Sequence, residues 1–260
     1  MYQLRLFFTA LQFFTRLPIP RWVGFEAHWL NHASRYFPLV GLVVGAITAA
    51  VYAAAAWLFP APVAVVLSTA TGIYATGAFH EDGFADMCDG FGGGMTVERV
   101  LEIMKDSRIG AYGAIGMTCM LGLKCVTLAM LPPVTAIAAL LAAHPLSRLM
   151  ATSLIWRMDY ARAEGKAKPL AQKMSSGEFF IAAATAAAPA LAICAAGWMA
   201  WTALAAGVIA AAIATLWLAR MFARRINGYT GDCLGAVQQV TEAMIYLALL
   251  ASLQHAALPA

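Results

Sequence analysis

The most concentrated group of residues able to do chemistry is acidic. The carboxylates of Glu81, Asp82, Asp86 and Asp89 lie within nine consecutive positions. If this segment is helical, Asp82, Asp86 and Asp89 project from one face, with Glu81 beside them. Like charges at this density repel one another unless a cation neutralises them, and hard oxygen ligands favour Mg²⁺ or Mn²⁺ over zinc. The pattern predicts a divalent-metal site, and a solvated interfacial loop is the plainer alternative.

The residues after this cluster are of the kinds that contact phosphate. A metal held by carboxylates and open to water can complete its coordination with diphosphate oxygens. The glycines between positions 90 and 94 allow a close backbone approach. Lys105 and Arg108 can neutralise the charge of a leaving phosphate, and Asp106 is a further ligand or general base. Asp232, in a later polar segment, can bring another carboxylate to the same rim.

The elements that must position these residues are membrane-spanning helices. Of 260 residues, 62% are hydrophobic and only 12% are charged, which is too few charges to cover a water-soluble domain. We expect an all-α polytopic bundle in one domain, 1–260, with a short interfacial helix over Leu4–Phe14. Seven apolar windows are each long enough to cross a bilayer: Phe37–Phe59, Pro62–Phe79, Tyr112–Leu131, Pro133–Trp156, Phe179–Trp198, Trp201–Ala219 and Ala236–Leu258.

The basic residues predict the orientation of these helices. If all seven windows cross, every one of the 17 Lys and Arg residues except Lys124 and Arg148 falls on one side of the membrane. Cytoplasmic loops carry such an excess, so this side is predicted to face the cytoplasm, together with the acidic cluster. The basic residues form no single stripe, which argues against nucleic-acid binding.

A few polar residues fall inside the predicted spans. Arg148 and Glu242 lie about two turns from the cytoplasmic ends of their helices and could line one inward-opening cavity, or form only a structural ion pair. For Lys124, snorkelling or a structural pair is the favoured interpretation. His80 has no partner spacing that predicts a metal site, and the five cysteines are interpreted as small apolar fillers.

Two blocks of this sequence resemble one family. Residues 79–90 read FHEDGFADMCDG and residues 104–113 read MKDSRIGAYG, and both resemble the cobalamin synthase family, also called adenosylcobinamide-GDP ribazoletransferase. Three shorter stretches are similar to that family in order and spacing: LQFFTRLP at 11–18, YFPLVG at 36–41 and TGDCLGA at 230–236. The resemblance therefore covers nearly the whole chain.

The resemblance implies an Mg²⁺-dependent transferase of the bacterial inner membrane. It would join adenosylcobinamide-GDP to α-ribazole or its 5′-phosphate, with release of GMP. The implied metal ligands are Glu81, Asp82, Asp86 and Asp89, with Asp106 and Asp232 as further candidates, and Lys105 and Arg108 would contact phosphate. The implied partners are these small molecules and the lipid bilayer, and a homo-oligomer stays open.

Three other functions compete with this one. A CDP-alcohol phosphotransferase would carry D-G-x-x-A-R followed by two further spaced aspartates, whereas Gly90 here leads into Phe91 and more glycine. A prenyl-diphosphate transferase would carry two aspartate-rich loops in related halves. A transporter would place its charges near the bilayer midplane in broken helices, whereas the acidic cluster here lies at the membrane edge.

Overall fold

The computed structural model describes residues 1–24, 26, 29–161 and 173–257, and in this part of the chain the regular elements are helices. An isolated bridge joins Tyr160 to Tyr229. Arg162, Lys166 and Lys168, counted above as cytoplasmic charges, lie outside the described residues. The elements are α1 (Tyr2–Phe14), η1 (Arg21–Val23), α2 (Trp29–Ala33), η2 (Ser34–Tyr36), α3 (Phe37–Ala56), α4 (Ala61–Thr76), α5 (Phe79–Gly93), α6 (Val97–Ile103), α7 (Ala111–Ala129), α8 (Pro133–Arg157), α9 (Ser176–Ala195), α10 (Trp201–Ile226) and α11 (Gly231–Ala257).

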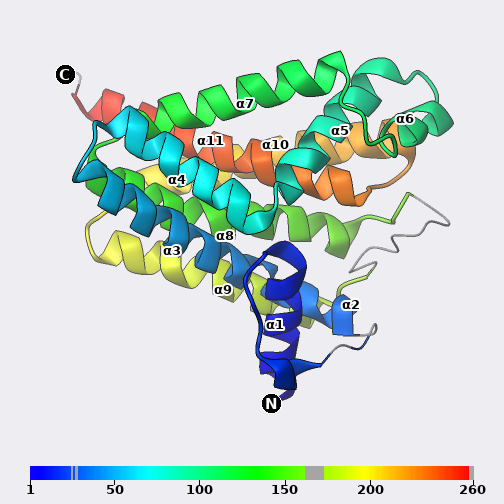
Figure 1. The fold of residues 1–260 in the computed structure, drawn as a ribbon, viewed down its shortest axis with the longest axis horizontal. Coiled ribbons are helices and arrows are strands. Elements are labelled where there is room, and N and C mark those ends of the chain that lie inside the picture. The colour runs from blue at the N-terminus through cyan, green and yellow to red at the C-terminus, as the bar shows by residue number, and fades with distance from the viewer. Residues whose placement is uncertain (25, 27–28, 162–172, 258–260) are drawn as a thin grey trace.

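The long helices form an elongated bundle (Figure 1). Six are long and apolar enough to cross a membrane, and α4 with α5 makes a seventh if this bent pair counts as one span. The predicted polytopic helical fold is therefore confirmed. The structure differs from the prediction at the second window, where α4 ends at Thr76 and the chain turns by 89° into α5.

Small residues let the central helices approach closely. On α3, a Cβ added at Gly41 would lie 2.6 Å from the carbonyl oxygen of His144, and one at Gly45 would lie 2.7 Å from that of Leu140. Both partners belong to α8, whose alanines are largely buried. Close backbone approach is the usual way in which membrane helices gain packing energy, since lipid offers no hydrophobic driving force between them. The α3–α8 pair is thus one of the close-packed contacts of the bundle.

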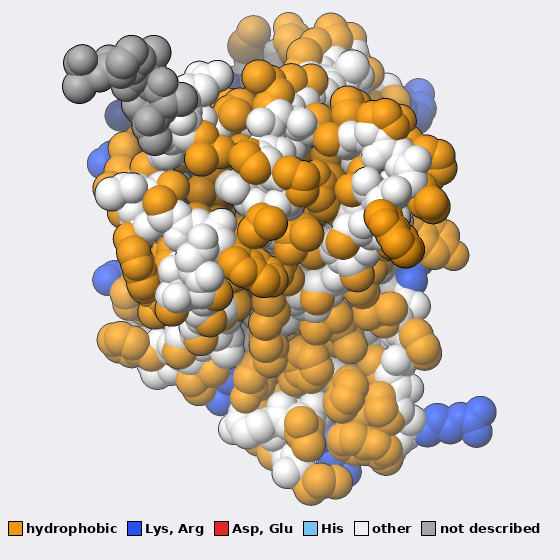
Figure 2. Space-filling model, turned by 90° about the vertical axis from the view of Figure 1, so that its left-hand side faces the viewer, with side chains coloured by type: hydrophobic (Ala, Val, Ile, Leu, Met, Phe, Trp, Pro, Cys, Tyr) orange, Lys and Arg blue, Asp and Glu red, His pale blue; other side chains and the backbone are white. Residues whose placement is uncertain are grey.

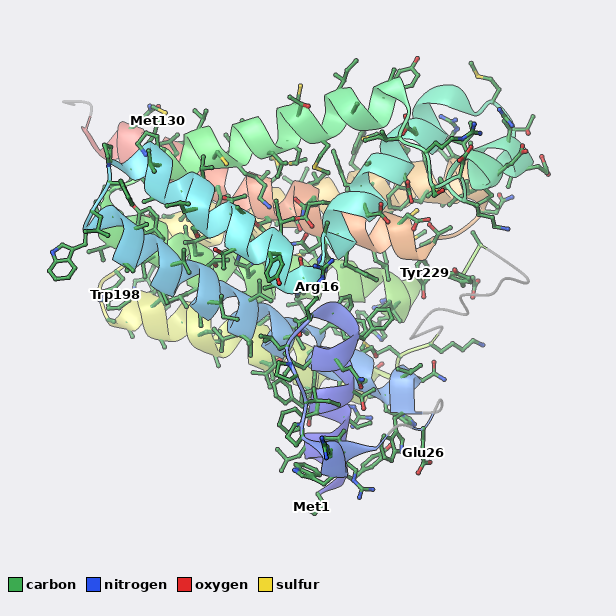
Figure 3. The ribbon with its side chains drawn as sticks, viewed as in Figure 1. Met1, Arg16, Glu26, Met130, Trp198 and Tyr229 are labelled. Atoms are coloured by element: carbon green, nitrogen blue, oxygen red, sulfur yellow. The ribbon has the colours of Figure 1, made fainter. Side chains whose placement is uncertain are left out.

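The two ends of the bundle differ in charge. The loops 57–60, 130–132 and 196–200 contain no Asp, Glu, Lys or Arg. Met130 and Trp198 mark this end in Figure 3, with Tyr229 toward the other. Figure 2 looks at the uncharged end and shows a surface dominated by hydrophobic side chains, with Lys and Arg only at its margins. Exposed Trp57, Trp198 and Trp201 gather there, as aromatic residues do at a membrane–water boundary.

Helix α1 runs across the direction of the bundle helices (Figure 1), as expected for a segment lying along a membrane surface. Its buried face includes Leu6, Ala10 and Phe14. The ring of Phe14 stacks on His80 of α5, with 5.4 Å between the centroids. The first helix therefore packs directly against the beginning of the acidic helix.

Candidate functional site

The acidic motif lies on its own helix, which begins after a sharp bend. Gly77 and Ala78 both have left-handed backbones, with φ of 65° and 60°. The N–H of Ala78 donates to the carbonyl of Ile73, at 2.9 Å, and so closes the end of α4. Arg16 supports the bend, since its backbone N–H donates to the carbonyl of Ala75 at 2.8 Å and its guanidinium lies over the Tyr74 ring (Figure 3). The bend turns α5 away from the direction of α4 and sets the motif at the charged end of the bundle.

Helix α5 carries all four predicted acids, but their environments differ. Asp82 is exposed and Asp86 is partly buried, whereas Asp89 is buried. Glu81 is partly buried and points toward the bundle interior, where it lines a cavity. Within the described residues, no group of three or more His, Cys, Asp or Glu side chains is placed to hold a metal ion. The protein side chains in this arrangement therefore supply at most a partial coordination shell.

Asp89 caps a neighbouring helix. Its carboxylate accepts the backbone N–H of Gly110 at 2.7 Å and of Gly113 at 2.8 Å. Gly110 is the N-cap residue of α7, whose first N–H groups have no partner within their own helix. A carboxylate at this position also meets the positive end of the helix dipole. Both oxygens of Asp89 thus join the end of α5 to the start of α7.

Asp232 lies against the same helix from the other side. A Cβ added at Gly83 of α5 would lie 3.0 Å from the Cα of Asp232, and one at Gly235 would lie 3.0 Å from the carbonyl oxygen of His80. These two glycines allow the backbones of α5 and α11 to touch. The hydroxyl of Thr230 donates to Asp232 at 3.2 Å, at the beginning of α11. The tertiary structure thereby brings the backbone of Asp232, far downstream in the sequence, against the acidic helix at Gly83.

Lys105, Asp106 and Arg108 occupy the exposed loop between α6 and α7. The guanidinium of Arg108 donates to both oxygens of Asp106, from Nε at 3.0 Å and from Nη2 at 2.7 Å, and the Arg108 backbone N–H donates at 3.1 Å. These bonds favour the ionised carboxyl and lower the pKa of Asp106 to about 2. In this arrangement Asp106 holds Arg108 and is itself a weak base.

A buried polar cluster lies beneath α5, in the interior of the bundle. Lys124 of α7 pairs with Glu242 of α11 at 2.6 Å and donates to Gln239 at 3.0 Å. His144 of α8 lies 3.3 Å from Glu242. These groups, together with Arg148 and Glu81, line a cavity of about 30 Å³. The shared cavity proposed for Arg148 and Glu242 is present, and Lys124 is buried in an ion pair, which is one of the two interpretations favoured above.

Sequence reasoning did not identify Gln238 and Gln239. Gln239 donates to Glu81 at 2.9 Å, so it connects the buried cluster to the acidic motif. Gln238 donates to Ser147 at 3.3 Å and also to Glu242. Two adjacent glutamines inside a predicted membrane span are costly unless they are hydrogen-bonded, and this was the available signal.

Comparison with known proteins agrees with the motif. The family model for cobalamin-5-phosphate synthase matches residues 6–250. A protein of Shewanella frigidimarina named adenosylcobinamide-GDP ribazoletransferase is 47% identical, over 96% of this chain and 95% of its own length. Proteins of the same name from Leptothrix cholodnii (45%, 96% of each chain) and Ralstonia nicotianae (48%, 95% of each chain) are similar over the same extent. No solved structure matches the chain. With its acidic helix, its seven apolar segments and this near full-length match, the chain belongs to the cobalamin-5-phosphate synthase family.

Proposed function

We propose that this protein is the transferase that joins adenosylcobinamide-GDP to α-ribazole, or to α-ribazole 5′-phosphate, in the last assembly step of the cobalamin nucleotide loop. The observation that carries the proposal is the position of Asp82 and Asp86 on α5, the helix that the backbone of Asp232 approaches at Gly83, at the basic end of the bundle. The relatives described above are named for this activity, and they match this chain over nearly their whole length.

The reaction is a displacement at phosphorus. A hydroxyl of α-ribazole forms a bond to the phosphorus attached to the cobinamide arm, the bond from that phosphorus to the bridging oxygen breaks, and GMP leaves with the bridging oxygen. The proton of the hydroxyl passes to a base. Negative charge develops on the diphosphate, so cationic groups near the leaving phosphate accelerate the step. Lys105 and Arg108 are exposed and suited to this contact.

We assign Asp106 to holding Arg108. A carboxyl with a pKa of about 2 is a poor proton acceptor at neutral pH. Its four hydrogen bonds with Arg108, three of them from the guanidinium, instead fix the direction of that group. The base is then sought among the α5 carboxylates.

The carboxylates of α5 fit an Mg²⁺ ion that takes most of its ligands from water and substrate phosphate. Mg²⁺ in phosphate chemistry is often held by only one or two carboxylates, with water and substrate phosphate oxygens as the remaining ligands. Asp82 and Asp86 on α5, with Asp232 on the adjoining helix α11, are the residues that would hold it. When bound, the ion would stabilise the charge of the diphosphate.

We place the protein in a bacterial inner membrane with this site toward the cytoplasm. Support comes from the contrast between the uncharged loops at one end and the basic segments at the other.

The direct test uses purified protein in detergent, supplied with adenosylcobinamide-GDP and α-ribazole, with GMP release measured with and without Mg²⁺. Asp82→Asn is expected to reduce Mg²⁺-dependent release at least about 100-fold, in line with the loss of a group that stabilises transition-state charge. No GMP release by the unmodified protein would refute the function. Undiminished turnover by Asp82→Asn would refute only the ligand role.

A further inference from the structure

The start of α5 is attached to the buried polar cluster through one side chain. Glu81 accepts a hydrogen bond from Gln239 at 2.9 Å, and Gln239 accepts one from Lys124 at 3.0 Å. Lys124 in turn pairs with Glu242, which also accepts from the hydroxyl of Tyr246 at 3.0 Å. The chain of contacts runs from the acidic motif through α11 to α7, and its members Lys124, Gln239 and Glu242 are all at most 5% exposed.

Two residues of opposite charge line the same cavity, and each has one buried polar atom without a hydrogen bond in the described part of the chain. Oε2 of Glu81 and Nε of Arg148 are buried, and neither has a hydrogen bond within the described residues. Both residues line the cavity of about 30 Å³, and Arg148 is only 3% exposed. Unpaired buried polar atoms cost free energy, and a cavity of this size is large enough to hold water that can satisfy them. A space of this size holds about two waters.

The four acids of α5 therefore divide by role. Glu81 joins the start of the helix to α11, and Asp89 joins its end to α7. Successive helical residues are turned by about 100°, so a helix fixed at Glu81 and Asp89 cannot rotate about its axis. The direction of Asp82 and Asp86 follows from these two attachments.

We propose that Glu81 is a positioning residue that sets the rotation of α5 through its hydrogen bond with Gln239, beside the cavity that it shares with Arg148. Its position next to Asp82 in the motif is thus not evidence of metal ligation. This inference rests on the proposed function in one respect, namely the reaction for which α5 is positioned. The hydrogen-bonded attachment itself can be measured without substrate or metal.

The experiment is a double-mutant cycle on the thermal unfolding of the full chain in detergent without Mg²⁺. Glu81→Ala and Gln239→Ala are each expected to lower the melting temperature by about 3 °C or more, as for the loss of a buried hydrogen bond. The double variant is expected to lose clearly less than the sum of the two single losses, because both substitutions remove the same contact. Gln238→Ala is the matched control: Gln238 is adjacent on α11 and equally buried, and its hydrogen bonds are to Ser147, Glu242 and Gln239 rather than to Glu81. Combined with Glu81→Ala, it is expected to give more nearly additive losses.

Activity supplies the second measurement. Glu81→Gln keeps an oxygen for Gln239, so the Mg²⁺ concentration needed for half-maximal GMP release is expected to stay within about threefold of the unmodified value, even where the rate falls. Asp82→Asn is expected to change that concentration by more than tenfold, or to abolish release. Additive losses in the Glu81–Gln239 cycle would overturn the proposal, as would a Glu81→Gln protein with the Mg²⁺ dependence of Asp82→Asn. Absence of GMP release from the unmodified protein would refute the proposed function while leaving the melting result to decide the positioning role.

Discussion

Oδ1 of Asp89 lies 2.8 Å from the backbone nitrogen of Gly113, so a carboxylate at the end of one helix caps the first turn of another. Asp89→Asn replaces one acceptor oxygen with an NH₂ group and leaves a backbone N–H of α7 unpaired in a buried position. We expect a loss of about 1–3 kcal/mol in the free energy of unfolding, measured by denaturation in detergent without Mg²⁺.

Asp82→Asn is the control for this measurement, because Asp82 lies on the same helix but is exposed. It is expected to change stability by less than about 0.5 kcal/mol. Equal stability of the Asp89→Asn protein and the unmodified protein would contradict the capping role.

The contact between α5 and α11 depends on glycine. A Cβ at Gly83 would approach the backbone of Asp232 to 3.0 Å at Cα and 3.1 Å at the carbonyl oxygen. Since backbone atoms cannot yield as a flexible side chain does, Gly83→Ala is expected to move the two helices apart and to lower both kcat and stability, the latter by about 1–3 kcal/mol. Gly122→Ala on α7 is the control, because a Cβ there meets nothing within 4 Å. A Gly83→Ala protein that behaves like Gly122→Ala would show that the contact is not needed.

The exposed pair of Asp106 and Arg108 predicts a particular pH dependence. The pKa of Asp106 falls from 3.8 to about 2 because Arg108 donates to its ionised form. A depressed carboxyl pKa stabilises the folded loop above about pH 4, and this contribution is lost as the pH falls through about 2. Arg108→Gln is expected to return the pKa of Asp106 toward 3.8, as measured by NMR of protein with ¹³C-labelled aspartate. At neutral pH, Asp106→Asn is expected to raise KM for adenosylcobinamide-GDP more than it lowers kcat. A pKa that stays near 2 in Arg108→Gln would exclude Arg108 as the cause.

The orientation of the bundle can be tested with two equally exposed positions. Met95, between α5 and α6, and Trp57, after α3, are each 90% exposed. In a background without the five native cysteines, Trp57→Cys is expected to react with a membrane-impermeant maleimide in right-side-out vesicles. Met95→Cys is expected to react only in inverted vesicles. Labelling of Met95→Cys from the outer face would place the acidic helix on the wrong side for a cytoplasmic substrate.

Much of this protein could be predicted from local pattern. Apolar windows long enough for a bilayer must become helices, because backbone groups in lipid have no other hydrogen-bond partners. Six of the predicted windows are long apolar helices in the structure, and the second is α4 with its bend into α5. The spacing of Asp82, Asp86 and Asp89 on one helix was predictable for the same reason, since helical periodicity is a local property.

The direction in which each acidic side chain points was decided by tertiary structure. Helical spacing does not distinguish the four acids of α5. In the structure Asp89 contacts the N-terminus of α7, 21 positions downstream, and Glu81 contacts Gln239 of α11, 158 positions downstream. The 89° bend at Gly77 and Ala78 combines a local feature, the left-handed backbone of both residues, with a long-range one, the contact with Arg16. Sequence determined which residues are present and which helix they share. Only the long-range contacts decided that Glu81 and Asp89 bond to other helices, because a side chain's partner depends on helices that the local pattern cannot place.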